Sequence, residues 1–222
     1  MARPTPTPIP TPTPTPTPTY WQRARRELAR ADPTMATIIR GARRGVVLAS
    51  RGDPFQTLAR SIVGQQISVK AAESVWQRLV QSVGGEPTSA HVAATPLDAL
   101  KAAGLSRRKA EYVGDLAQHF ASGRLDPNGW GAMDDEAIID LLTEVRGVGR
   151  WTAEMFLIFN LMRPDVLPVA DLGLQRAVSL HYRNGRVMSE RTLRRIAVPW
   201  APWRSVATWY LWRSLEPVPV EY

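Results

Sequence analysis

Signals that begin and end helices recur along the chain after Tyr20, and they leave little room for other structure. Asp53-Pro54 can begin one helix, because the aspartate accepts from free backbone amides and proline suits the first turn. Ser68 and Ser106 can begin two more, and glycines follow the apolar stretches after each of them. No segment alternates polar and apolar residues between hairpin turns. The chain is therefore predicted to be all-α, with about eight to ten helices.

The N-terminal segment follows a different pattern. Residues 4–19 alternate proline mainly with threonine, so backbone donors are missing at every second position and an extended polyproline form is favoured. We predict that residues 1–19 form a disordered tail or spacer. Docking of this segment to a proline-recognition module is the alternative.

Composition narrows the classes of function. The chain of 222 residues has no cysteine, which excludes disulfides, thiolate nucleophiles, cysteine-ligated zinc and iron–sulfur clusters. It has only 3 histidines, so no catalytic zinc site and no cofactor are expected. No apolar run reaches the roughly 18 residues of a membrane span, and no signal peptide is recognisable. We expect an intracellular protein without membrane partners, in the cytoplasm near the nucleoid of a prokaryote or in the nucleus of a eukaryote.

The balance of charge indicates a class of partner. The formal net charge is +8, and of the 28 basic residues only Lys70, Lys101 and Lys109 are lysines. An arginine-rich, basic chain is typical of proteins that bind a polyanion such as a nucleic acid. An arginine-rich proteome would give the same balance without such binding.

Gly147-Val148-Gly149 separates two stretches that both have helical patterns. Because glycine has no β-carbon, the backbone of such a corner can approach a ligand closely, and free amides at the start of the second helix can bind a phosphate. Arg146 and Arg150 flank the turn and add positive charge without reading sequence. The same pattern also fits a tight corner between helices with a left-handed glycine.

Four segments occur in an order typical of one family: IVGQQISVKAA, GRWTAEMF, DLGLQRA and PWRSVATWYLW. Together they resemble the helix–hairpin–helix DNA glycosylases, and within them the AlkA-type 3-methyladenine DNA glycosylase II branch. The resemblance implies two helical lobes with the active cleft between them. Residues 56–163 would form a central lobe with the wedge turn and the hairpin, and residues 20–55 with 164–222 would form the other.

The resemblance also implies how the chain would hold DNA. The hairpin would clamp a backbone phosphate through the amides of Gly147 and Gly149. Carbonyls of the same turn, those of Val145 and Val148, would hold a monovalent cation, and no catalytic metal is implied. The expected DNA-binding residues are Gln65, Gln66, Arg146, Gly147, Val148, Gly149, Arg150 and Thr152.

A wedge must fill the gap that a flipped base leaves in the stack. By resemblance it lies in the turn GQQIS, where Gln66 matches a position at which some relatives carry leucine. Gln65 in the same turn is the alternative. Both glutamines also fit a purely structural role at the corner between two helices.

Two positions carry the chemistry that the resemblance implies. Relatives that also cleave the DNA strand have a lysine at the position of Trp151, and because tryptophan cannot form an imine, a monofunctional glycosylase without lyase activity is expected. Trp151 would line the base pocket. Asp171 matches the catalytic aspartate, which would stabilise positive charge on the sugar while orienting or deprotonating a water. From the residues alone, Asp171 also fits an ordinary helix N-cap.

The expected substrate is an alkylated purine such as 3-methyladenine in double-stranded DNA, with excision initiating base excision repair. The positive charge of such a base makes it a good leaving group and suits a pocket of aromatic faces. Tyr112, Trp209 and Trp212 are further candidates for the pocket, although the two tryptophans equally fit helix packing. The alternatives are a glycosylase for another damaged or mismatched base and a non-catalytic DNA-binding module. A monomer is expected.

Overall fold

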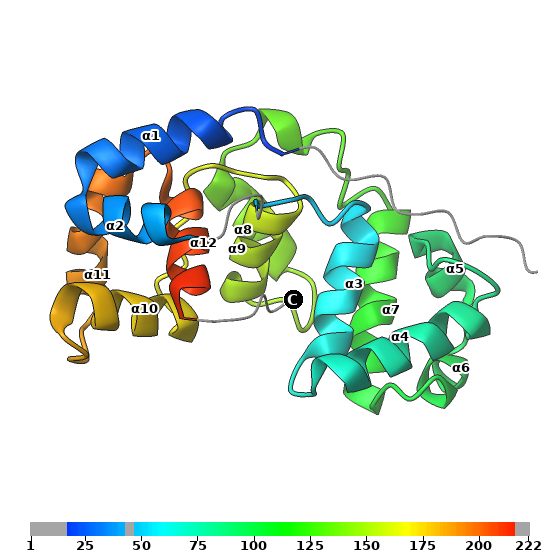
Figure 1. Cartoon of the computed structure of the whole chain (residues 1–222). Coiled ribbons are helices and arrows are strands. Elements are labelled where there is room, and N and C mark those ends of the chain that lie inside the picture. Colours follow the sequence, from blue (N-terminus) through cyan, green and yellow to red (C-terminus); the bar gives the residue numbers. More distant parts are fainter. Residues whose placement is uncertain (1–16, 43–46, 216–222) are drawn as a thin grey trace, which may run out of the picture.

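The computed structural model describes residues 17–42 and 47–215. Within these ranges the chain forms helices and connecting turns and contains no strand, which confirms the predicted all-α fold (Figure 1). The predicted disordered tail falls mostly on residues 1–16, outside the described residues.

The described ranges contain more helices than the sequence predicted. The α-helices are α1 (Trp21–Ala31), α2 (Pro33–Gly41), α3 (Pro54–Gly64), α4 (Val69–Ser82), α5 (Ser89–Ala94), α6 (Leu97–Ala102), α7 (Arg107–Ala121), α8 (Asp135–Thr143), α9 (Arg150–Phe159), α10 (Leu172–Arg183), α11 (Glu190–Ile196) and α12 (Arg204–Ser214), and the short 3-10 helices are η1 (Trp130–Ala132) and η2 (Val198–Trp200). One cause is Asp32-Pro33, which ends α1 and begins α2. The other is α5, whose 6 residues are too few to show a helical period.

Helix starts follow the predicted capping residues. The side chains of Asp53, Ser68 and Ser106 each accept a hydrogen bond from the backbone amide three residues further on, at 2.8, 3.2 and 3.3 Å. Each bond satisfies one of the amides that the first turn of a helix leaves free. The all-α fold was predictable because these signals are local.

The helices pack in two groups. In one group α3, α4, α5, α6 and α7 contact one another, and in the other α1, α2, α10, α11, α12 and η2 do so. Helix α9 packs against both α8 and α3, and Figure 1 shows α8 and α9 between the two groups. The division into lobes of residues 56–163 and of residues 20–55 with 164–222 stays a prediction, and α3 begins near its first boundary.

Asp32 connects the N-terminal helices to the C-terminal part of the chain. Its Oδ1 accepts the backbone amides of Thr34 at 2.8 Å and Met35 at 3.1 Å, so it caps α2. Its Oδ2 accepts the Tyr182 hydroxyl at 2.7 Å and the Trp200 indole N–H at 2.8 Å. Burial, and after it the hydrogen bond to Asp32, raises the pKa of Tyr182. This carboxylate therefore joins α2, α10 and η2.

None of the helices in the described ranges is both long enough and apolar enough to span a membrane.

Candidate active site

Asp171 caps α10 and at the same time receives two indole donors. Its Oδ1 accepts the backbone amide of Leu174 at 2.6 Å and the indole N–H of Trp212 at 2.7 Å. Its Oδ2 accepts the indole N–H of Trp151 at 2.9 Å. The residue is 9% exposed. Donors from three helices, α9, α10 and α12, thus fix the carboxylate in one orientation.

Trp151 is the exposed member of this cluster. It lies in the first turn of α9, and 45% of its surface is exposed, although its N–H is bound to Asp171. The bond restricts the rotation of the indole. The result is an aromatic surface, open to solvent, beside a carboxylate with restricted access.

Trp212 supports the carboxylate at its other oxygen, Oδ1. Its ring stacks on Phe159 with centroids 5.7 Å apart and an interplanar angle of 13°. The guanidinium of Arg51 lies 4.6 Å from the centroid of the Phe159 ring. Gly173 allows Trp212 to come this close, because a β-carbon added there would lie 3.0 Å from Trp212 Cδ1. Trp212 is therefore a positioned hydrogen-bond donor to Asp171.

The structure places the other two aromatic candidates elsewhere. Trp209 is 4% exposed and packs edge-on against Trp21 at 5.1 Å, so it belongs to the core and the expectation that it lines a pocket is corrected. Helix α12 is buried on most sides, which is why a spacing of three residues did not separate Trp209 from Trp212. Tyr112 lies against the hairpin at Gly147.

The hairpin has the geometry that a phosphate site needs. Gly147 has a φ of +85°, and a β-carbon there would overlap the ring of Tyr112. Gly149 is the N-cap of α9 and has no side chain to use up amides of the first turn. Within the described part of the chain, the amides of Gly147 and Gly149 donate no hydrogen bond. Val148 is buried and anchors the turn.

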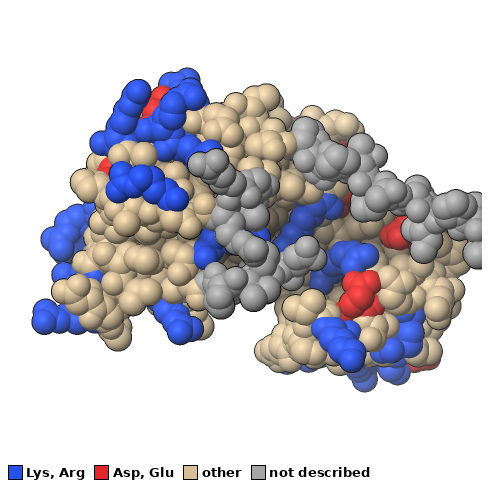
Figure 2. Space-filling view, in the orientation of Figure 1, with Lys and Arg blue, Asp and Glu red and all other residues tan. Residues whose placement is uncertain are grey.

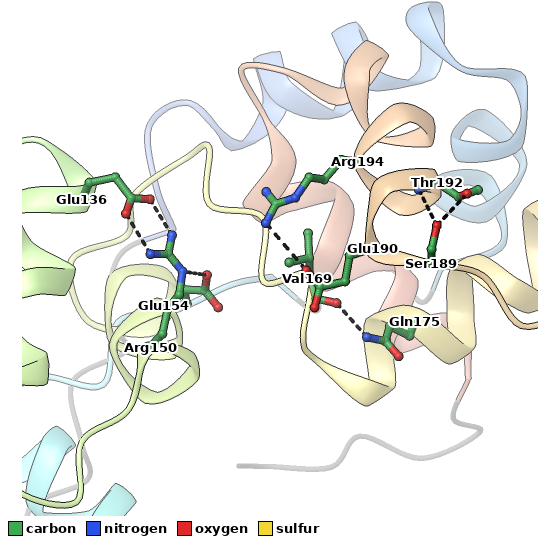
Figure 3. A network of polar contacts seen from close by, with 9 residues as sticks. All are labelled: Glu136, Arg150, Glu154, Val169, Gln175, Ser189, Glu190, Thr192 and Arg194. Atoms are coloured by element: carbon green, nitrogen blue, oxygen red, sulfur yellow. Dashed lines mark hydrogen bonds and ion pairs between the residues drawn. The ribbon is translucent and has the colours of Figure 1, made fainter.

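The two arginines beside the hairpin both have carboxylate partners. The backbone amide and the guanidinium of Arg146 donate to Asp115 at 2.9 and 3.3 Å. Arg150 donates to Glu136 of α8 and to Glu154 of its own helix (Figure 3). Burial raises the pKa of Glu154, and Arg150 acts in the opposite direction.

Figure 3 also shows what faces this cluster. Arg194 and Glu190 of α11 form an ion pair of 4.0 Å, and Gln175 donates to the carbonyl of Val169 at 2.8 Å. The side chain of Arg146 remains 61% exposed, whereas that of Glu154 is only 5% exposed. The side chain of Arg150 is 53% exposed, so both arginines beside the hairpin present positive charge at the surface.

The two glutamines of the predicted wedge turn are in different environments. The side-chain amide of Gln65 donates to the carbonyl of Gly147 at 2.9 Å. Gln66 has a φ of +60° and an exposed side chain. The apolar residues Ile67 and Val69 next to it are 41% and 64% exposed. Gln65 thus links the turn to the hairpin, while Gln66 projects from the turn.

The remaining predicted residues lie around the same hairpin. Thr152 is buried in the first turn of α9, and the carbonyl of Val145 accepts the amide of Val148 at 3.1 Å. The monovalent cation at the carbonyls of Val145 and Val148 stays a prediction. On the face shown in Figure 2, basic side chains are more numerous than acidic ones over both helix groups.

Lys109 and Asp115 were not among the residues predicted for the site. Both lie on α7. Lys109 donates to carbonyls of the wedge turn, and Asp115 accepts a backbone amide of the hairpin. Their spacing, with Tyr112 between them at three-residue intervals, marks one face of a helix and is the signal that would have found them.

The chain is similar to known proteins over most of its length. A family model described as HhH-GPD superfamily base excision DNA repair protein matches residues 59–202. DNA-3-methyladenine glycosylase 1 of Schizosaccharomyces pombe is 30% identical over 165 residues, 73% of this chain and 72% of that protein. The putative DNA-3-methyladenine glycosylase YfjP of Bacillus subtilis is 31% identical over 169 residues, and the match covers 73% of this chain but only 59% of that protein.

Solved structures are similar over most of the chain. The crystal structure of a DNA-3-methyladenine glycosidase from Bacillus halodurans has a TM-score of 0.81 and 37% identity, over 87% of this chain and 89% of that one. The S. pombe 3-methyladenine DNA glycosylase in complex with abasic DNA has a TM-score of 0.74 and 28% identity, over 86% of this chain and 96% of that one.

Proposed function

Because the chain belongs to the HhH-GPD superfamily of base excision DNA repair proteins, we propose that it is a DNA glycosylase that hydrolyses the N-glycosidic bond of alkylated purines in double-stranded DNA. Its relatives in S. pombe and B. subtilis are named as 3-methyladenine DNA glycosylases. The observation that carries the proposal is the carboxylate of Asp171, which three N–H donors hold beside the exposed ring of Trp151. The excision initiates base excision repair, in the compartment of the cell that contains the chromosomal DNA.

The arrangement around Asp171 suits cleavage of this bond. When the C–N bond breaks, its electron pair leaves with the base and positive charge develops on the sugar. A fixed carboxylate stabilises that charge without having to reorient. Water then attacks the anomeric carbon, and its proton passes to Asp171 or to bulk water. Oδ2 accepts only the Trp151 N–H among the described residues, so this oxygen has lone-pair capacity left for the sugar or the water.

Trp151 has two roles in this proposal. Its indole N–H orients Asp171, and its exposed ring stacks on the flipped base. An alkylated purine with a positive charge is attracted to an electron-rich aromatic face. Damaged bases also leave the stack at lower cost than normal ones, which adds to selectivity.

The enzyme is monofunctional in this proposal because no lysine is placed to form an imine. Trp151 occupies the position at which strand-cleaving relatives carry the nucleophilic lysine. Lys109 donates to carbonyls of the wedge turn, while Lys70 and Lys101 are exposed on α4 and α6. The product is therefore an abasic site in an intact strand.

The DNA is held at two turns. The free amides of Gly147 and Gly149 bind a backbone phosphate at the N-terminus of α9, where the helix dipole favours negative charge. Gln66 is the wedge, because its side chain is exposed while that of Gln65 is bound to the hairpin. The protein acts as a monomer.

The test is release of free base from methylated DNA by the wild type and by Asp171→Asn, followed by treatment with alkali. We expect the wild type to release 3-methyladenine and to leave strand breaks only after alkali. Asparagine keeps the helix cap but not the charge, so Asp171→Asn should bind DNA and release no base. Strand breaks without alkali would contradict the monofunctional mechanism. If neither protein releases alkylated bases, a panel of duplexes with oxidised or mismatched bases decides between another lesion and a binding module.

A further inference from the structure

Three side chains on one face of α7 contact the two turns that the proposed function places on DNA. Lys109, Tyr112 and Asp115 follow one another at three-residue intervals and so lie along the same side of the helix. Lys109 contacts the wedge turn, Asp115 contacts the hairpin, and Tyr112 lies between them against Gly147.

The ammonium of Lys109 holds the wedge turn by its backbone. It donates to the carbonyl of Val63 at 2.8 Å and to that of Gln65 at 2.6 Å. Val63 lies in the last turn of α3 and Gln65 is its C-cap, so the cation lies at the negative end of the α3 dipole and satisfies carbonyls that the helix leaves free. The next residue is Gln66, with its φ of +60°. A left-handed residue other than glycine persists only where its surroundings fix it.

The hairpin is held by the same helix. Asp115 Oδ2 accepts the backbone amide of Arg146 at 2.9 Å, and the ring of Tyr112 occupies the space beside Gly147 that a β-carbon would need. The side chain of Gln65 donates to the carbonyl of Gly147 and so connects the wedge turn directly to the hairpin. Wedge turn, hairpin and α7 are thus joined in a ring of contacts, although Gln65 and Gly147 are 82 positions apart in the sequence.

We propose that Lys109 is a positioning residue for base flipping. By tying the wedge turn to α7, it fixes the distance between Gln66 and the phosphate-binding hairpin. This inference rests on the proposed function of the two turns. Insertion of a wedge must coincide with the grip on the phosphate, because the flipped base returns to the stack if the gap stays open. A small misplacement of a positioning group can reduce a rate by up to about 100-fold.

The test compares Lys109→Met, which keeps length and loses the donors, with Lys109→Arg and with the control Lys101→Met. Lys101 lies on α6 and, among the described residues, pairs only with Asp98 at the surface, so its removal controls for the loss of one positive charge. Single-turnover release of one alkylated purine is measured from a duplex and from the same strand unpaired. We expect Lys109→Met to be about 10-fold slower on the duplex and within about twofold of wild type on the single strand, which needs no flipping out of a pair. Lys109→Arg should recover part of the duplex rate, and Lys101→Met should match wild type on both.

A second readout does not depend on base release. In a duplex with 2-aminopurine opposite an abasic-site analogue, insertion of the wedge unstacks the probe and raises its fluorescence. We expect a smaller rise at saturating Lys109→Met than at saturating wild type or Lys101→Met. If the wild type releases no base from any substrate, the proposed function fails and this fluorescence alone decides the role of Lys109. Equal rises for wild type and Lys109→Met, or equal loss of rate on duplex and single strand, would overturn the inference.

Discussion

Asp32 and Asp171 are two buried aspartates that make the same kinds of hydrogen bond. Each precedes a helix, and each caps it by accepting a backbone amide, as Oδ1 of Asp32 does for α2 and Oδ1 of Asp171 for α10. Each also accepts the indole N–H of a tryptophan far away in the sequence. Their exposures are 6% and 9%. Burial and capping alone therefore do not separate a structural carboxylate from the one proposed to be catalytic.

The difference lies in the donors around the second oxygen. Oδ2 of Asp32 accepts from both Tyr182 and Trp200, and Trp200 is 0% exposed. Oδ2 of Asp171 accepts from Trp151 alone among the described residues, and Trp151 is 45% exposed. The carboxylate of Asp32 is saturated inside the protein, while Oδ2 of Asp171 keeps remaining capacity beside the exposed indole of Trp151. The number of donors at Oδ2 separates the structural carboxylate from the one proposed to be catalytic.

The largest expected effect comes from removing the charge of Asp171. Asp171→Asn should lower the rate of base release by at least about 100-fold, because electrostatic stabilisation of the sugar cation is lost. The free energy of unfolding should change little, since asparagine is as good an N-cap as aspartate, and the amide NH₂ meets only the N–H of the exposed Trp151, which can turn to water. Single-turnover base release and denaturant unfolding measure the two quantities. Activity within a few-fold of wild type would remove Asp171 from the mechanism.

The matched change at Asp32 should give the opposite result. In Asp32→Asn the new amide NH₂ replaces one oxygen and faces the donors that this oxygen accepted, such as those of Tyr182 and Trp200. A buried donor is then left unpaired, so the free energy of unfolding should fall by about 2 kcal/mol. The rate of base release by the folded protein should stay at the wild-type level. Denaturant unfolding, with activity measured below the transition, checks both. A loss of activity without a loss of stability would break the contrast between the two aspartates.

A smaller effect is expected when Asp171 loses one indole donor. Trp212→Phe keeps a ring to stack on Phe159 and removes the hydrogen bond to Oδ1. Because a hydrogen bond to a charged group contributes about 1.5 kcal/mol, the rate of base release should fall about tenfold. Trp200→Phe is the control, since it removes the same bond from Asp32 and should lower stability only. Equal activity losses in both variants would point to a general structural effect.

The smallest effect is expected at Tyr182. Tyr182→Phe removes one donor from Asp32 and should lower the free energy of unfolding by about 1 kcal/mol near neutral pH. Because the pKa of Tyr182 is raised in the folded protein, its contribution is present below about pH 10 and is lost as the pH rises above that. The variant should therefore lose stability less steeply than wild type as the pH rises above about 10. Parallel alkaline profiles for the two proteins would contradict this assignment.

The same pair of aspartates shows how much of the fold and of the site can be predicted from the sequence. Caps are local signals, so the all-α fold and the start of α10 at Asp171 were predictable from nearby residues. Asp32-Pro33 carries the same local signal, and nothing around it indicates that its carboxylate is saturated. The donors that distinguish Asp171 come from 20 and 41 positions away in the sequence. Only the resemblance to a family, and then the structure, brought them together.

Two further predictions depended on tertiary packing, which the order of residues in the sequence does not show. Trp209 and Trp212 are three residues apart on a helix that is buried on most sides, so their period could not show that one faces Trp21 and the other Asp171. Gln65 and Gln66 are adjacent, yet Gln65 is bound to the hairpin, whereas Gln66 has a left-handed backbone and an exposed side chain. The backbone contacts of Lys109 link segments that are 44 and 46 positions apart.

The double use of Asp171, as the cap of α10 and as the proposed catalytic residue, has a consequence for cells that carry an inactive copy of the protein. Asparagine satisfies the helix as well as aspartate does, so a protein with Asp171→Asn would fold, bind DNA and flip the lesion. It would then remain on the lesion and shield it from the active enzyme. Loss of the charge would thus create a competitor of repair, and its harm would grow with its abundance.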